Sequence, residues 1–170
     1  METTKARILG PQEGEMAWLG GIGARFMIDG GDAGQRFSLV EHPLPPRALA
    51  APLHRHSRED EYSFVLEGTL GALLGEEVII GKPGDLVFKP RHQWHTFWNA
   101  GETPARILEI ISPAGFENFF RDIGKFKGVQ VVPEESLREL SRKYGIEFDA
   151  ASIPRLIERF GVRFPVEPPA

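Results

Sequence analysis

Residues 53–68 of the chain read LHRHSREDEYSFVLEG, and residues 84–99 read GDLVFKPRHQWHTFWN. In the first segment His54 and His56 alternate, so the two imidazoles point to one face if the segment is extended. Glu61 follows at the start of an apolar strand, where its carboxylate can project into the same interior as the two histidines. The segment therefore gathers metal-binding side chains on one face.

The second segment adds a third imidazole, because His95 begins another apolar strand after the turn at Pro90-Arg91-His92. Three imidazole nitrogens and one carboxylate oxygen suit a first-row divalent ion, and this donor set does not separate iron, nickel, manganese, cobalt, copper and zinc. Four protein ligands leave one or two coordination positions open for a substrate. The residues predicted to bind one divalent transition metal are His54, His56, Glu61 and His95.

Around these segments, from Met16 to Ser112, short apolar runs are separated by turn sequences such as Lys82-Pro83-Gly84-Asp85. Short, evenly spaced strands without intervening helices predict an all-β sandwich or barrel rather than a parallel α/β sheet. The predicted strands are Ala17–Leu19, Ala24–Ile28, Gln35–Glu41, Glu61–Glu67, Thr69–Leu74, Glu76–Ile80, Asp85–Lys89, His95–Trp98 and Ala105–Ile111. The run GGIGARF at 20–26 is interpreted as a turn or bulged strand, since it lacks the third glycine and the helix of a dinucleotide site.

After Ser112 the apolar residues recur at helical spacing, and each predicted helix is followed by a glycine stop. We expect a β-barrel at 1–112 and a helical appendage of the same domain at 113–170, without a second core and with a proline-rich tail at 165–170. The predicted helices are Phe116–Ile123 before Gly124, Pro133–Tyr144 before Gly145, and Ile153–Phe160 before Gly161, the last with Ser152 as its N-cap.

The two segments together resemble the paired motifs of the cupin superfamily. The first motif of that family reads Gly, five residues, His-x-His, three or four residues, Glu, six residues, Gly. Here four residues separate His56 from Glu61, and six separate Glu61 from Gly68. The second motif reads Gly, five residues, Pro-x-Gly, two residues, His, three residues, Asn, and the chain matches it at Gly84, Pro90, His95 and Asn99.

The chain departs from these motifs at two glycines, which are replaced by Ala48 and His92. The second replacement either reshapes the turn or holds His92 in a left-handed conformation. The resemblance implies a cupin jelly-roll β-barrel with short C-terminal helices and a metal near the barrel mouth. It also implies coordination by Glu61 and by the Nε2 atoms of His54, His56 and His95.

The C-terminal part carries a further resemblance. The run PAGFENFFRDIG, followed by a helix and YGIEF, is similar to the tail of small single-domain cupins related to bacterial quercetin 2,3-dioxygenase. The resemblance implies that the metal binds the substrate and that the ligand glutamate takes the substrate's hydroxyl proton before dioxygen enters. Glu61 is then a catalytic general base as well as a ligand.

Further side chains near the motifs are candidates for a substrate pocket. Strand parity with the predicted ligands turns Ser63, Val65 and Phe97 to the interior. Glu109 interrupts an apolar strand, either as a pocket acid or at an exposed position. His92 is included only because it lies near the third histidine ligand.

Other polar and aromatic residues have two interpretations. Glu59 and Asp60 are expected to lie on a solvated loop surface, with Asp60 as the second choice of carboxylate ligand. His42 has no supporting motif and is interpreted as structural. The helix that contains Phe116 and Phe120 is expected to pack its apolar face on the barrel, and the alternative is a lid over the metal site.

Composition excludes several classes of partner. The formal net charge is -4 and no cysteine is present, which argues against nucleic acid, anionic lipid and thiolate sites as partners or centres. No apolar run has the length of a signal peptide or a membrane span, so a cytoplasmic protein is expected. The predicted partners are a small-molecule substrate, dioxygen and a second copy of the chain, which would pair through the strands at 17–41.

Three functions are consistent with these features. The leading hypothesis is a quercetinase-like, metal-dependent dioxygenase that acts on a small enolisable or phenolic compound. The second is a non-catalytic cupin that binds or senses a small molecule. The third is an isomerase or decarboxylase that uses the same metal as a Lewis acid.

Overall fold

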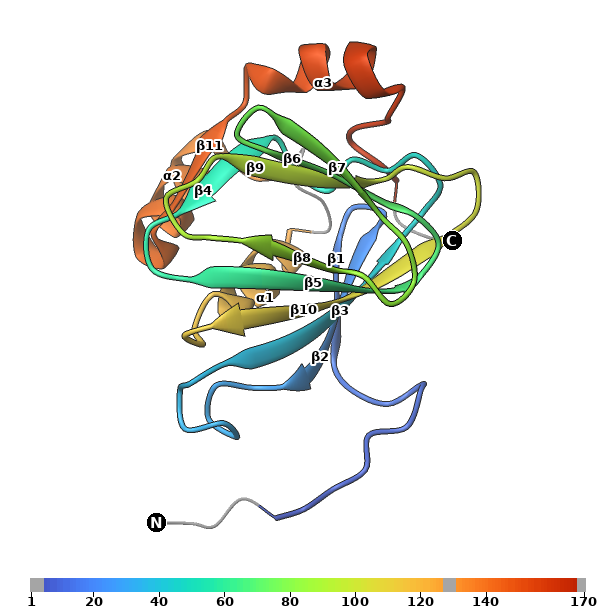
Figure 1. Cartoon of the computed structure of the whole chain (residues 1–170). Coiled ribbons are helices and arrows are strands. Elements are labelled where there is room, and N and C mark those ends of the chain that lie inside the picture. The colour runs from blue at the N-terminus through green and yellow to red at the C-terminus, as the bar shows by residue number, and fades with distance from the viewer. Residues whose placement is uncertain (1–4, 127–130, 168–170) are drawn as a thin grey trace.

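A computed structural model describes residues 5–126 and 131–167 of the chain, and Figure 1 shows two antiparallel sheets that face each other. The first sheet has six strands, and β1 lies at one edge and β8 at the other. The contact with a second copy that was predicted for 17–41 includes edge strand β1 and stays a prediction. In spatial order the strands are β1 (Met16–Leu19), β2 (Ile22–Ile28), β3 (Ser38–Leu44), β10 (Ala105–Ser112), β5 (Asp60–Glu67) and β8 (Leu86–Lys89).

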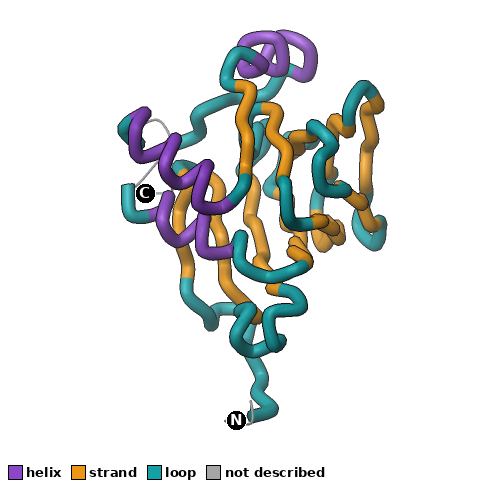
Figure 2. The backbone as a smooth tube through the Cα atoms, turned by 90° about the vertical axis from the view of Figure 1, so that its left-hand side faces the viewer, coloured by secondary structure: helices purple, strands orange, loops and turns teal. Residues whose placement is uncertain are grey.

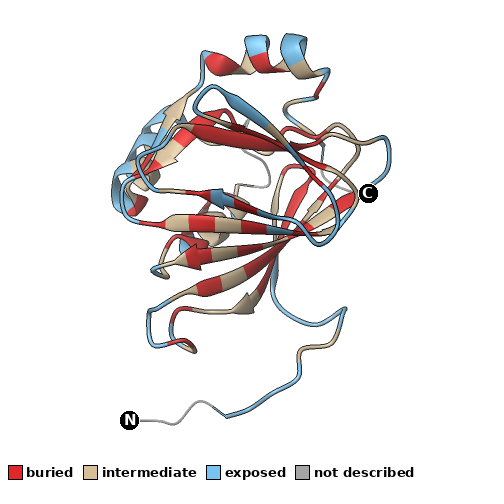
Figure 3. Ribbon diagram, viewed as in Figure 1, coloured by how far each residue is buried: buried red, intermediate tan, exposed pale blue. Residues whose placement is uncertain are grey.

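The second sheet has five strands and includes the segment with the paired histidines. Residues of both sheets, such as Val65 and Ile107 from the first and Phe97 from the second, share one buried apolar cluster. Along β5 and β10 buried residues alternate with more exposed ones, which is visible as banding in Figure 3. The predicted all-β jelly-roll fold is confirmed. The strands in spatial order are β11 (Ile146–Asp149), β4 (Leu53–His56), β9 (His95–Asn99), β6 (Leu70–Leu74) and β7 (Glu77–Gly81).

The strands β4 and β11 were not among the predicted ones, and the predicted strand that shifts most is β3. β3 covers Ser38–Leu44 instead of Gln35–Glu41, and it continues through Pro43. The pairs of β3 with β2 end at Glu41, so Pro43 needs no amide hydrogen on that side. Gly23 of β2 lies against the proline ring, and a Cβ atom at this glycine would approach Pro43 Cγ to 2.6 Å. The absence of a side chain at Gly23 therefore lets the proline lie within the sheet.

The C-terminal part contributes a strand to the barrel. Strand β11 pairs antiparallel with β4, and Phe148 lies opposite His54. Helix α3 (Ser152–Phe160) is also tied to β4, because the Leu53 N–H donates to Ser152 Oγ over 2.9 Å. The prediction that Ser152 is the N-cap was wrong: α3 starts at Ser152, and its hydroxyl donates to the Asp149 carbonyl instead. Residues beyond 112 thus support the histidine strand.

The other two helices lie side by side over one flank of the barrel, away from α3, as Figure 2 shows. These are α1 (Glu117–Gly124) and α2 (Glu134–Tyr144), and α2 ends at the left-handed Gly145 as predicted. The predicted stop at Gly124 was wrong, because this glycine lies inside α1 and Lys125 is the C-cap. Phe116 and Phe119 are buried in a cluster that also contains Ile111 of β10. The apolar face of α1 therefore packs on the barrel. No helix in the described ranges has the length and apolarity needed to cross a bilayer.

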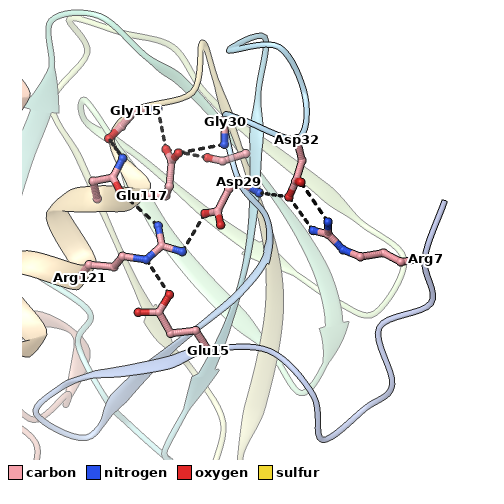
Figure 4. Close-up of polar contacts among 10 residues, drawn as sticks. Arg7, Glu15, Asp29, Gly30, Asp32, Gly115, Glu117 and Arg121 are labelled. Carbon is pink, nitrogen blue, oxygen red and sulfur yellow. Dashed lines mark hydrogen bonds and ion pairs between the residues drawn. The ribbon is translucent and has the colours of Figure 1, made fainter. Parts of the chain in front are cut away.

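Polar contacts hold α1 against the loop between β2 and β3 (Figure 4). Glu117 is buried, and its carboxylate accepts hydrogen bonds from the Gly30 N–H, the Gly115 N–H and the Ser38 hydroxyl. One turn later the Arg121 guanidinium donates to Glu15 and Asp29, both over 2.8 Å. The described contacts make α1 an anchored wall of the barrel.

Candidate metal centre and apolar cavity

Four buried side chains from three strands meet inside the barrel. His54 and His56 extend from β4, Glu61 from β5 and His95 from β9, and one ligand atom of each lies within 4.8 Å of the others. His54 and His95 are directly opposite each other across the β4–β9 pair. The alternation along β4 turns both of its histidines inward, because only the intervening Arg55 is partly exposed.

Backbone carbonyls orient two of the imidazoles. His54 Nδ1 lies 2.9 Å from the Pro52 carbonyl oxygen, and His95 Nδ1 lies 3.0 Å from that of Gln93. A carbonyl oxygen only accepts, so each Nδ1 carries the hydrogen and each Nε2 keeps its lone pair. The Nε2 atoms of His56 and His95 are buried without a hydrogen bond among the described residues. Free, inward lone pairs of this kind fit a divalent cation.

The protonation states also fit a metal. Burial lowers the pKa of His54 well below its usual value and lowers that of His56 to about 4, so both rings are neutral at physiological pH. Burial alone would raise the pKa of Glu61, but the positive charge of Lys89, followed by the contacts with His56 and His95, holds this pKa well below its usual value. Neutral imidazoles and an ionised carboxylate are the forms that bind metal.

Lys89, which sequence reasoning missed, lies directly behind Glu61. Its side chain has no exposed surface, and Nζ lies 3.0 Å from Glu61 Oε2 and 2.9 Å from Glu109 Oε2. The ammonium group also lies 4.5 Å from the centre of the Phe97 ring. The sequence did carry a signal for this inward direction of Lys89. Side chains alternate along Leu86–Lys89, Val87 faces inward, and Lys89, two residues later, faces the same way.

Glu109 is the second carboxylate bound by this lysine. Ser63, directly opposite across the β5–β10 pair, donates its hydroxyl to Glu109 Oε2 over 2.8 Å. Burial raises the pKa of Glu109 to about 7, against the opposing effect of the Lys89 charge. Glu109 Oε1 is buried without a hydrogen bond from any described residue.

An apolar cavity of about 240 Å³ lies beside the candidate metal centre, and two of the four candidate ligands, His54 and Glu61, form part of its wall. Glu109 and His42 also line it, so His42, which was interpreted as structural, faces the same space as the candidate ligands. Most other lining residues are apolar, from the barrel, α1 and the segment after α2. They include Ile22, Phe97, Phe116, Phe119, Phe120 and Phe148.

Some sequence-predicted positions lie away from this cavity. Val65 packs in the buried apolar cluster shared by the two sheets. Ser63 does not line the cavity but donates a hydrogen bond to Glu109, which does. His92 is exposed, because its turn directs the side chain to solvent, and its φ of 68° is the left-handed conformation that the motif comparison considered. Asp60 pairs with Arg91 at the surface instead of joining the ligands.

The expectation that Glu59 lies on a loop surface was wrong. Only 4% of Glu59 is exposed, and Oε2 lies 3.9 Å from His56 Nδ1. Burial raises the pKa of Glu59 to about 7. The loop before β5 turns Glu59 toward His56, three residues earlier in the chain, a contact that the acidic run at 59–61 does not reveal.

Comparisons with known proteins agree with this geometry. Residues 41–111, which contain all four candidate ligands, match the family model described as a cupin domain. This match assigns residues 41–111 to a cupin domain. A comparison with curated proteins found no match.

Several solved structures share this fold, and each of the three below matches about two thirds of this chain. KdgF from Halomonas sp. is 20% identical, with a TM-score of 0.58 over 65% of this chain and 96% of its own. An RmlC-like cupin from Shewanella frigidimarina is 19% identical, with a TM-score of 0.54 over 66% and 95%. The polyketide cyclase RemF from Streptomyces resistomycificus is 25% identical, with a TM-score of 0.55 over 64% and 80%. Because these three structures carry different functional names, the similarity does not identify a reaction for this chain.

Proposed function

We propose that the chain is a metal-dependent enzyme of quercetinase-like type, a dioxygenase that acts on a compact enolisable or phenolic compound. The observation that carries the proposal is the position of the ligands. Three imidazoles and one carboxylate converge beside an apolar cavity whose wall includes His54 and Glu61, so an open coordination position would face a bound organic molecule. A cavity of about 240 Å³ favours a substrate of one or two rings.

The four converging residues would hold the metal, which when bound would polarise the substrate oxygen and favour its ionised form. Glu61 is the carboxylate of this group, and we assign to it the acceptance of the substrate's hydroxyl proton. Lys89 holds Glu61 in place and balances its charge inside the barrel. The aromatic wall around Phe97 and Phe119 excludes water and gives a flat substrate an apolar surface.

A second candidate is a non-oxidative proton transfer, such as an isomerisation, a decarboxylation or a cyclisation. Glu109 favours it, because a cavity carboxyl whose pKa is about 7 suits proton exchange near neutral pH. The similarity to the polyketide cyclase RemF is consistent with this candidate.

Oxygen uptake tests the proposal. Protein loaded in turn with iron, nickel, cobalt, manganese, copper and zinc is mixed with flavonols, catechols and 1,3-dicarbonyl compounds, and dissolved oxygen is recorded with product formation. The dioxygenase proposal predicts oxygen consumption that matches product and is lost in Glu61→Gln but kept in the exposed variant His92→Gln. Turnover that continues without oxygen would support the second candidate instead. Tight binding without turnover, unchanged in Glu61→Gln, would indicate a binding protein.

A further inference from the structure

Two polar residues that line the apolar cavity, His42 and Glu109, each carry an atom without a hydrogen bond among the described residues, and both lie outside the metal-binding group. The first belongs to His42, which is 2% exposed and lines the cavity from β3. Its Nδ1 lies 2.8 Å from the Gly23 carbonyl oxygen, so Nδ1 carries the hydrogen. Burial lowers the pKa of His42 to about 4, which keeps the ring neutral and Nε2 a hydrogen-bond acceptor. Among the described residues no group donates to Nε2.

The second atom is Glu109 Oε1. The lysine and serine bonds at Glu109 both reach Oε2, over 2.9 Å from Lys89 Nζ and 2.8 Å from Ser63 Oγ. Within the described chain Oε1 receives no hydrogen bond, although only 1% of the residue is exposed. Lys89 and Ser63 thus fix the direction of the carboxyl group and leave Oε1 without a hydrogen bond from the described chain.

Unpaired buried polar atoms indicate a ligand that pairs them. Glu109 Oε1 is such an atom. Its burial without a partner costs roughly 1–3 kcal/mol, and a well-placed ligand group recovers this energy. An apolar ligand would leave both atoms unpaired. A hydroxyl group can donate to either atom, and it can also accept from Glu109 when that carboxyl is protonated.

We propose that His42 Nε2 and Glu109 Oε1 form a recognition subsite for a hydroxyl group of the substrate, separate from the oxygen that reaches the metal centre. The inference rests on the proposed function in one respect, that the cavity is where the substrate binds. It narrows the substrate class to compact aromatic or other flat apolar molecules that carry at least two oxygen functions. One of them faces the imidazole cluster, and a hydroxyl faces His42 and Glu109.

The subsite is tested without a metal by comparing phenol with toluene, which have similar size and differ by a hydroxyl in place of a methyl group. Dissociation constants for both are measured on the metal-free full chain by NMR titration. The variants are His42→Phe, which removes Nε2, and Glu109→Met, which conserves volume and leaves Lys89 paired with Glu61. Ile123→Val alters the same wall without a polar change and is the control.

The ratio of the toluene constant to the phenol constant is expected to fall about tenfold in each polar variant and to stay within about twofold in the control. Thermal unfolding establishes which variants are folded. One folded polar variant, either His42→Phe or Glu109→Met, is sufficient to test the subsite. An unchanged ratio in the folded polar variants, or no saturable binding of phenol to the wild type, would overturn the subsite. These titrations need neither metal nor turnover. If the proposed enzyme activity failed in the oxygen-uptake experiment, the binding result for the subsite would still stand.

Discussion

Lys89 Nζ lies 3.0 Å from Glu61 Oε2, and the two residues are directly opposite each other on β8 and β5. The lysine is fully buried, and it also binds Glu109 from the other side. A fixed cation therefore stands between the candidate ligand carboxylate and the carboxylate of the proposed subsite. This contact couples the metal centre to the cavity wall.

Replacing Lys89 by Met should strongly destabilise the metal-free protein. Two buried carboxylates would then lose their shared cation, and breaking a buried ion pair from one side costs about 3–5 kcal/mol. Urea unfolding measures the loss, with Lys82→Met at an exposed position as the control. A bound divalent metal should reduce the loss, because it supplies positive charge beside Glu61. Equal stability of the Lys89 and Lys82 variants would contradict this role.

Glu59 should tune metal affinity through His56. Its Oε2 lies 3.9 Å from His56 Nδ1, a distance that a small ring movement toward a metal-bound position can change. Removal of such a partner typically lowers metal affinity about 10–100-fold. Calorimetric titration of Glu59→Ala with Zn²⁺ should show this drop, and exposed Glu76→Ala should bind as the wild type does. If Glu59→Ala binds Zn²⁺ with wild-type affinity, Glu59 has no role in the metal centre.

Glu109 should make stability depend on pH. Its pKa rises from an ordinary value of 4.5 to about 7 in the folded chain, so between these values the folded state keeps a proton that the unfolded state releases. The free energy of unfolding should therefore fall as pH rises through this window, by about 3 kcal/mol relative to Glu109→Gln. Urea unfolding of both metal-free proteins across the window measures the difference. A difference that is independent of pH would refute the shift.

Phe120 should limit the size of the ligand. The ring lines the cavity and lies 5.0 Å from the His42 ring. Phe120→Ala should admit larger ring systems, with about tenfold tighter binding of 1-naphthol than in the wild type. The control is Phe88→Ala, which removes a ring that is 47% exposed on the outer face. If both variants bind 1-naphthol equally, Phe120 does not form the limiting wall.

Local patterns were sufficient to predict most of the barrel and the cluster of four side chains. Alternation placed the two histidines of β4 on one face, and the glycine stops at Gly145 and Gly161 ended α2 and α3 as expected. The predicted strand at 35–41 overlaps β3 at 38–41 and ends three residues early, since Pro43 lies inside the strand and its tolerance there depends on the distant Gly23. Such pairings between neighbouring strands are not encoded locally.

The polar surroundings of the site were harder to predict for the same reason. Lys89 and Glu59 are charged residue types that are usually exposed. Lys89 is buried against partners on other strands, and Glu59 is buried because its loop turns it toward His56, three residues earlier. His42 faces the cavity although no motif marks it. A residue whose role depends on long-range contacts carries little signal in its own segment.

The most direct test of the account is the metal content and affinity of the purified chain. Metal-free protein is titrated with Zn²⁺ and Ni²⁺ by calorimetry, and elemental analysis is made on protein purified without chelator. The wild type and exposed variant His92→Ala should each bind one equivalent, and His95→Ala and Glu61→Ala should lose stoichiometric binding. Stoichiometric binding that survives in both ligand variants, or no binding by the wild type, would contradict a metal centre formed by His54, His56, Glu61 and His95.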